Sequence, residues 1–145
     1  MSLEYTVDLV TRDPPNAVMD FVHAAVAAPG GAGLVVTAAP IDYAPTREMY
    51  AESFGFEPTV TVTVPVDKHA APGEARDAHA VAVLAALLAR YDGGLYAHYA
   101  GVQPVALRRG PGEAPLIAAE WLALRPWART ALPSMLTEGE VPEPE

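Results

Sequence analysis

The stretch TVTVTVPV, residues 59–66, alternates threonine with valine, and it decides how the rest of the chain is interpreted. Successive side chains of a β-strand point to opposite faces of a sheet, so the valines form one side of this predicted strand and the threonines the other. Pro65 has no N–H to donate to a neighbouring strand, so we expect the strand to end there or to present an exposed edge there. The valines are expected to pack in the core.

The segments around this strand predict a larger sheet and two main helices. Apolar residues recur with helical spacing over residues 18–26, where Asp13 is the expected N-cap ahead of two prolines, and again over residues 73–91. Residues 41–53 fit a long loop, an edge hairpin or a short helix, and a last helical turn is expected around Trp127. Alternating or β-branched stretches predict further strands at residues 3–11, 34–39, 95–101, 102–110 and 115–121.

This order of elements predicts an α+β fold. Helices that are segregated from antiparallel strands pack as a two-layer sandwich, here with a mostly antiparallel sheet and the two main helices on one of its faces. A chain of 145 residues fits one domain, which we expect to span residues 1–137. Residues 138–145 are rich in glutamate and proline, and this composition predicts a disordered acidic tail.

Composition and charge exclude several classes of partner. The net charge of −9 opposes binding to nucleic acid, and the lack of cysteine excludes disulfides and thiolate metal sites. Glu4 and Asp8 lie where a secretory signal needs positive charge. The longest apolar stretch, residues 80–89, is about half of the ~20 residues that cross a bilayer. We therefore expect a cytoplasmic protein with neither a membrane nor a nucleic-acid partner.

No motif in the sequence predicts a catalytic site, a metal site or a cofactor. The histidines at positions 23, 69, 79 and 98 show no metal-ligand spacing. The polar triplet Asp67-Lys68-His69 has no nucleophilic serine near it in sequence. The glycines of PGGAG, residues 29–33, follow a predicted helix and precede a predicted strand, which is the reverse of a phosphate-binding loop.

The threonine side of the predicted sheet is the candidate binding surface. If the helices cover the valines, the opposite face is open to water or to another protein. Threonine tolerates water, so a plain solvated sheet is the simpler interpretation, whereas tyrosine and arginine favour contacts with proteins. The side chains expected on this face are Glu4, Thr6, Asp8, Thr59, Thr61, Thr63, Tyr96, His98 and Arg108.

Three stretches carry a family resemblance. They are LEYTVDLVT at residues 3–11, FGFEPTVTVTVPVDK at residues 54–68, and ARDAHAVAVLAALLARYDGGLYAHYAGVQPVALRRG at residues 75–110. Together they resemble the swarming-inhibition immunity family of bacterial polymorphic toxin systems. The resemblance implies a non-enzymatic protein that binds and neutralises a cognate toxin inside the producing cell. An acidic domain could then cover the toxin with its sheet face or with residues 43–56, and opposite charge would speed their encounter.

A second class of function stays open on sequence alone. Tyr43, Tyr50, Phe54 and Phe56 form an aromatic concentration that, with the open sheet face, could enclose a small ligand in a binding or catalytic α+β domain. A deep pocket lined by Tyr96 and His98 would favour that alternative, and a flat face would favour a protein partner. A third interpretation is that these aromatic side chains only close one edge of the core.

Overall fold

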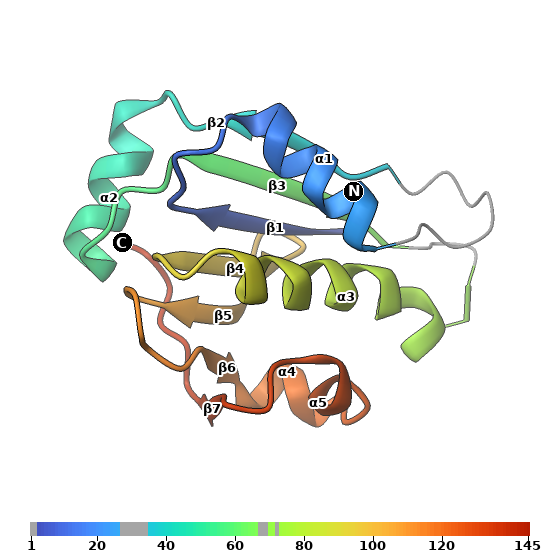
Figure 1. Cartoon of the computed structure of the whole chain (residues 1–145). Helices are drawn as coiled ribbons and strands as arrows, with labels where there is room; N and C mark the ends of the chain where they lie inside the picture. Colours follow the sequence, from blue (N-terminus) through green and yellow to red (C-terminus); the bar gives the residue numbers. More distant parts are fainter. Residues whose placement is uncertain (1–2, 27–34, 67–69, 72) are drawn as a thin grey trace.

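A seven-stranded sheet runs through the protein (Figure 1). The computed structural model describes residues 3–26, 35–66, 70–71 and 73–145. The strand order is β2-β3-β1-β4-β5-β6-β7, and neighbouring strands are antiparallel except for β6 and β7, which are parallel. The strands are β1 (Glu4–Leu9), β2 (Thr37–Pro40), β3 (Val60–Pro65), β4 (Leu95–Tyr99), β5 (Gln103–Arg108), β6 (Leu116–Ala118) and β7 (Thr137–Gly139).

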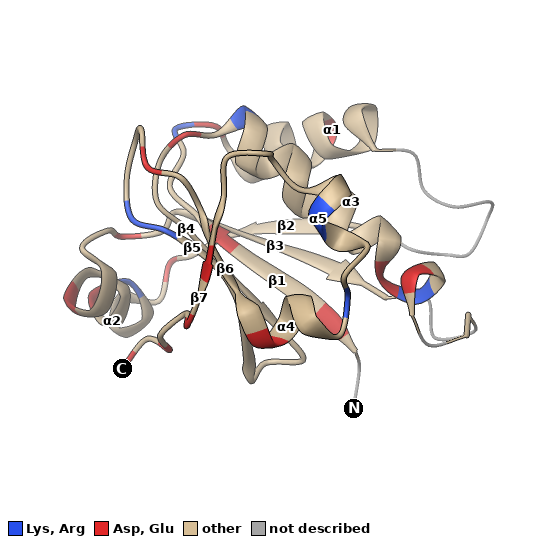
Figure 2. Ribbon diagram, turned by 90° about the horizontal axis from the view of Figure 1, so that it is seen from below, with Lys and Arg blue, Asp and Glu red and all other residues tan. Residues whose placement is uncertain are grey.

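Two long helices cover one face of this sheet. The helices of the described chain are α1 (Pro15–Ala25), α2 (Ala44–Phe54), α3 (Glu74–Arg90), α4 (Ala119–Ala123) and α5 (Ala128–Ala131). Figures 1 and 2 show α1 and α3 side by side over the sheet, whereas α2 lies on the other side at one end of the strands. We call the face under α1 and α3 the helix face and the opposite one the second face. The predicted α+β sandwich, with a mostly antiparallel sheet and two main helices on one face, is confirmed.

The valine side of β3 packs in the core, as the alternation predicts. Val60, Val62 and Val64 are at most 2% exposed, and each contributes about 1.5–3 kcal/mol by leaving water. They meet the apolar side of α3, where Val81, Val83, Leu84 and Leu87 are also almost completely buried. Pro65 is the last residue of β3, so the strand ends where its missing N–H would interrupt the ladder.

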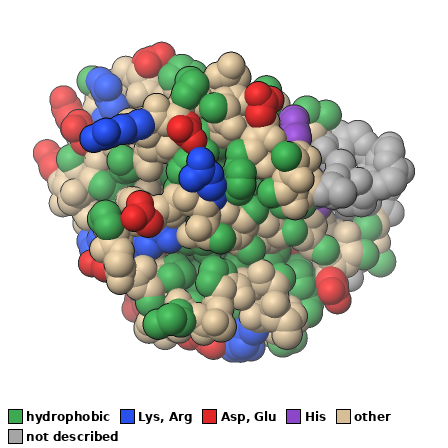
Figure 3. Space-filling view, viewed as in Figure 1, with side chains coloured by type: hydrophobic (Ala, Val, Ile, Leu, Met, Phe, Trp, Pro, Cys, Tyr) green, Lys and Arg blue, Asp and Glu red, His purple; other side chains and the backbone are tan. Residues whose placement is uncertain are grey.

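An ion pair near one end of the helix face joins α3 to the chain after α4. Nε of Arg125 lies 2.8 Å from Oδ2 of Asp77, and the guanidinium stacks over the rings of Tyr99 and Trp121 at 5.3 and 5.2 Å from their centroids. The indole of Trp121 donates a hydrogen bond to the hydroxyl of Tyr5 at 3.0 Å. The polar groups of this cluster are thus used to hold the fold together. Figure 3 shows the molecule from the side of α1 and α3, where charged side chains are scattered among apolar ones.

The start of α1 differs from the expectation. Asp13 was predicted to cap this helix, and that prediction is wrong: Pro14 is the N-cap residue and Pro15 the first helical residue. Asp13 therefore lies one position too early to reach the first turn. Its carboxylate instead accepts a hydrogen bond of 2.9 Å from the hydroxyl of Tyr91, which follows α3.

Two other segments are clarified by the structure. Residues 41–53, which fitted three interpretations, contain most of α2, and Gly55 ends this helix in the left-handed conformation with φ of 81°. The strand expected over residues 115–121 covers only Leu116–Ala118 in the structure, and the chain then turns into α4. The expected helical turn near Trp127 is present as α5.

Residues 138–145, the predicted acidic tail, begin within β7. Glu138 and Gly139 belong to β7, which pairs with β6, and Glu138 accepts a hydrogen bond of 2.9 Å from Nε of Arg129. Beyond β7, Val141 is only 6% exposed. Backbone pairing and the burial of one apolar side chain thus connect this segment to the sheet, and its disorder stays a prediction.

Candidate binding face

Strand register brings seven of the nine predicted side chains together on the second face. Thr6 of β1 lies between Thr63 of β3 and His98 of β4, and Asp8 lies between Thr61 and Tyr96. Paired residues point to the same side of a sheet, so these side chains all point away from α1 and α3. The seven are Glu4, Thr6, Asp8, Thr61, Thr63, Tyr96 and His98.

Helix α2 covers one end of this face. The hydroxyl of Tyr50 donates a hydrogen bond to Oδ2 of Asp8, and the ring of Phe54 packs on Tyr96 with centroids 5.1 Å apart. As a result Asp8 and Tyr96 are 6% and 3% exposed. These two predicted site residues therefore pack against α2 and offer little surface to a partner.

The accessible remainder is a smaller polar patch. Its five side chains are half-buried, and we call it the threonine face: Glu4, Thr6, Thr61, Thr63 and His98. Thr37 of β2 extends it, because this exposed residue lies opposite Thr63. Sequence reasoning missed Thr37, since the register of β2 against β3 cannot be read from a four-residue strand with no alternation of its own.

The other two predicted residues have structural roles. Thr59 comes just before β3, and its hydroxyl accepts a hydrogen bond of 3.0 Å from the N–H of Thr11 and donates one of 2.9 Å to the Thr11 carbonyl. Arg108 was expected on the second face, and this placement is wrong. It pairs with Leu95 on the helix face, where its guanidinium binds carbonyl oxygens at the end of α3. The concentration of carbonyl oxygens there attracts a cation.

Burial sets the protonation of the two titratable rings on the second face. Desolvation lowers the pKa of His98, although the nearby carboxylates of Asp8 and Glu4 act in the opposite direction. Burial, Glu143 and Asp8 together raise the pKa of Tyr96 to about 12. At neutral pH His98 is therefore an uncharged imidazole and Tyr96 an uncharged phenol, so neither ring brings a charge to this face.

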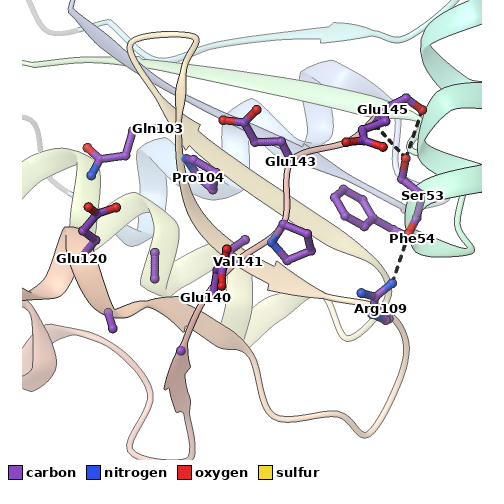
Figure 4. A pocket seen from close by; sticks show the side chains of 14 residues that line it. Ser53, Phe54, Gln103, Pro104, Arg109, Glu120, Glu140, Val141, Glu143 and Glu145 are labelled. Atoms are coloured by element: carbon purple, nitrogen blue, oxygen red, sulfur yellow. Dashed lines mark hydrogen bonds between the residues drawn. The ribbon is translucent and has the colours of Figure 1, made fainter.

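Two hollows lie beside the threonine face, one on each side of residues 140–145, which we call the C-terminal segment. The larger, of about 970 Å³, is shown in Figure 4 and lies between this segment, the end of α2, β5 and the start of α4. The smaller, of about 330 Å³, is lined by Met49, Tyr50, Tyr96, His98 and Glu143, among others. Glu143 borders both hollows.

The described parts of the chain contain neither a cluster of metal-binding side chains nor a membrane-spanning helix. Over residues 3–26, 35–66, 70–71 and 73–145, no three histidine, aspartate or glutamate side chains are grouped so that they could bind a metal ion. Within the same ranges, no helix has both the length and the apolar character needed to span a bilayer.

Comparison with known proteins gives one match. A family model described as SitI3-like matches residues 3–121, from β1 into α4. No curated protein and no solved structure matches the chain. The matched range includes every residue of the threonine face.

Proposed function

The chain belongs to the SitI3-like family, and we propose that it is a non-enzymatic immunity protein that binds and neutralises a cognate bacterial toxin. The family match agrees with the resemblance to swarming-inhibition immunity proteins found in the sequence. The structural observation that carries the proposal is the threonine face, a polar patch of three neighbouring strands that lies on the side of the sheet opposite to α1 and α3.

The chemistry of this face suits a protein partner. Thr6, Thr61 and Thr63 present hydroxyl groups that donate and accept hydrogen bonds, on strands whose backbone is held rigid by neighbours on both sides. Glu4 adds a carboxylate, and the whole chain carries a net charge of −9. A basic toxin surface would therefore be drawn to this protein before contact, with an association rate that falls as salt rises.

Co-expression with the protein encoded by the adjacent gene tests this proposal. We expect that protein to be toxic alone, harmless together with this chain, and recovered in complex with it. In the complex, Thr63→Arg should weaken association at least about tenfold, since it places a bulky cation in the centre of the docking surface. Ala24→Arg is the matched control, because Ala24 is an exposed residue of α1 on the other side of the sheet.

Two outcomes would contradict the proposal. If the neighbouring protein is harmless alone, or never co-purifies with this chain, it is not the cognate toxin. Equal effects of Thr63→Arg and Ala24→Arg on association would instead show that the threonine face is not the docking surface. The immunity function would then have to use another part of the chain.

The smaller hollow supports a second candidate, a small-molecule site. It lies where the sequence placed that alternative, between the second face and α2, and Tyr50, Tyr96 and His98 line it. Its volume of about 330 Å³ is at the lower end of the range for ligand pockets. Phe54 and Phe56, in contrast, stack on each other and close the edge of the core. A ligand screen that follows the NMR signals of His98 tests this candidate, and no saturable shift would exclude it.

A further inference from the structure

The C-terminal segment, residues 140–145, is held on the second face by few contacts. Val141 is 6% exposed and belongs to the apolar core. At the far end the N–H of Glu145 donates to Oγ of Ser53 at 2.8 Å, and this hydroxyl lies 3.3 Å from the Glu145 carbonyl oxygen (Figure 4). These two hydrogen bonds are exposed to water, which weakens their net contribution. One buried apolar side chain, the half-buried Pro144 and one serine thus anchor six residues.

The hollows on either side of the segment show that it does not fill the space it crosses. The larger hollow reaches Phe54, Pro104 and Ala118, and the smaller one reaches Tyr96. Residues of the segment line both. If the segment left the surface, the two hollows would join into one groove with a partly apolar floor between α2 and β6.

Charge also gives the segment little hold on this surface. It carries Glu140, Glu143 and Glu145 to a surface that already holds Glu120. The negative charge of Glu143, like that of Asp8, raises the pKa of the Tyr96 phenol. Among the described residues, Arg109 is the one arginine or lysine that lines either hollow. Neither of the ion pairs found among the described residues includes the segment, so no salt bridge holds it on this surface.

We propose that the C-terminal segment is a displaceable strap over a peptide-binding groove, and that the toxin partner replaces it with an extended segment of its own. The site of Val141 accepts an apolar side chain. The three glutamates of the strap leave with it, but the rest of the chain still has more acidic than basic residues, which favours lysine or arginine on either side of that apolar residue. The predicted partner segment is therefore an apolar residue flanked by basic ones. This inference rests on the proposed function, and it adds to the threonine face a neighbouring groove that is closed in the free protein.

The first experiment needs no toxin. A chain ending at Gly139 keeps β7 and lacks the strap, and it is titrated with a synthetic peptide of residues 139–145 while the NMR signals of His98 and Tyr96 are followed. We expect a Kd of about 0.1 mM, since a strap at an effective concentration of about 1 mM must bind this tightly to stay closed in most molecules of the full chain. A peptide with Glu143→Lys and Glu145→Lys should bind at least about fivefold tighter at low salt. A peptide with Val141→Ser should not bind.

The full chain is the control for these titrations. It should bind each peptide at least about tenfold more weakly than the shortened chain, because its own strap occupies the groove. Two results would contradict the proposed strap. In the first, no peptide shifts the NMR signals of His98 and Tyr96, and in the second, the full chain and the shortened chain bind the peptides with equal affinity. If the shortened chain does not fold, Val141→Ser in the full chain releases the strap and takes its place in the comparison.

The second experiment measures affinity for the co-purified toxin. Loss of the strap by shortening or by Val141→Ser should raise the affinity about tenfold, since the partner no longer has to displace it. Unchanged or weaker affinity, with neutralisation retained, would overturn the strap and leave the proposed function standing. Failure of all three chains to bind any toxin would overturn the proposed function, and the peptide titrations would then decide the strap on their own.

Discussion

The guanidinium of Arg108 donates a hydrogen bond of 3.0 Å from Nη1 to the carbonyl oxygen of Leu88, in the last turn of α3. Nη2 binds the carbonyl of Tyr91, and Nε binds that of Gly93 at 2.9 Å. Arg108 is 6% exposed, so its removal leaves carbonyl groups without partners in a buried place. We expect Arg108→Leu to lower the free energy of unfolding by about 3 kcal/mol, measured by urea denaturation.

Arg109→Leu is the matched control for this variant. Arg109 follows in sequence, but its hydrogen bond to the Ser53 carbonyl is long, at 3.3 Å, and exposed to water. Its loss should cost less than about 1 kcal/mol. Equal destabilisation by the two variants would mean that the capping of α3 by Arg108 contributes nothing specific.

Gly94 allows the close approach of Phe56 to the start of β4. A Cβ atom at position 94 would lie 2.6 and 2.7 Å from Cδ2 and Cδ1 of the Phe56 ring, which no real contact tolerates. Gly94→Ala should therefore lower the melting temperature, at a cost of about 1–3 kcal/mol. Gly110→Ala is the control, since nothing lies within 4 Å of the added atom there. A neutral Gly94→Ala variant would show that the ring moves aside freely.

The sequence was most informative where one physical pattern decided the structure. Alternation along β3 predicted which side chains enter the core, and Val62 and Val64 are fully buried. The helical period and the acidic first turn predicted α3 almost to its ends. For β1, the same alternation predicted both the strand and the outward direction of Thr6. These predictions needed only local sequence, because each element buries one clear apolar side.

The predictions that failed or stayed open depend on contacts between distant segments. Helix α2 has little apolar periodicity, and its position is set by Tyr50 and Phe54 packing on Tyr96, some 40 residues away. The direction of Arg108 depends on strand register, which shifts between Ala97 and His98. The pairing of Glu138 and Gly139 depends on β6 as a partner. Neither composition nor period contains such information, so the candidate face was predicted only in part.

Tyr50 and Asp8 form the polar link between α2 and the sheet. The phenol donates to Oδ2 of Asp8 beneath a largely aromatic cover, with both residues at most 6% exposed. Tyr50→Phe removes the donor and leaves the carboxylate buried, so we expect a loss of about 1–3 kcal/mol in unfolding free energy. A double-mutant cycle with Asp8→Asn should give a coupling energy of about 1–2 kcal/mol. Additive effects would contradict a direct link.

Stability should fall as the pH drops below neutral, because the buried His79 and the half-buried His98 resist protonation. The pKa of His79 in α3 is lowered by burial and then by the positive charge of His23, and its Nδ1 has no partner within the described residues. Burial also lowers the pKa of His98. In the unfolded chain both return to the ordinary pKa of 6.5, so the unfolded state binds more protons just below that pH.

The direction in which stability changes with pH follows from this difference in proton binding. The full contribution to stability is present above about pH 6.5, and it is lost as the pH falls towards the lowered pKa values of the folded state. Urea midpoints measured between pH 7.5 and 5 should decrease, and His79→Gln should flatten that decrease. His98→Gln should flatten it further, whereas His23→Gln removes only the second cause acting on His79 and should have a smaller effect. A midpoint that does not change with pH over this range would show that both imidazoles gain a proton in the folded protein as readily as in water.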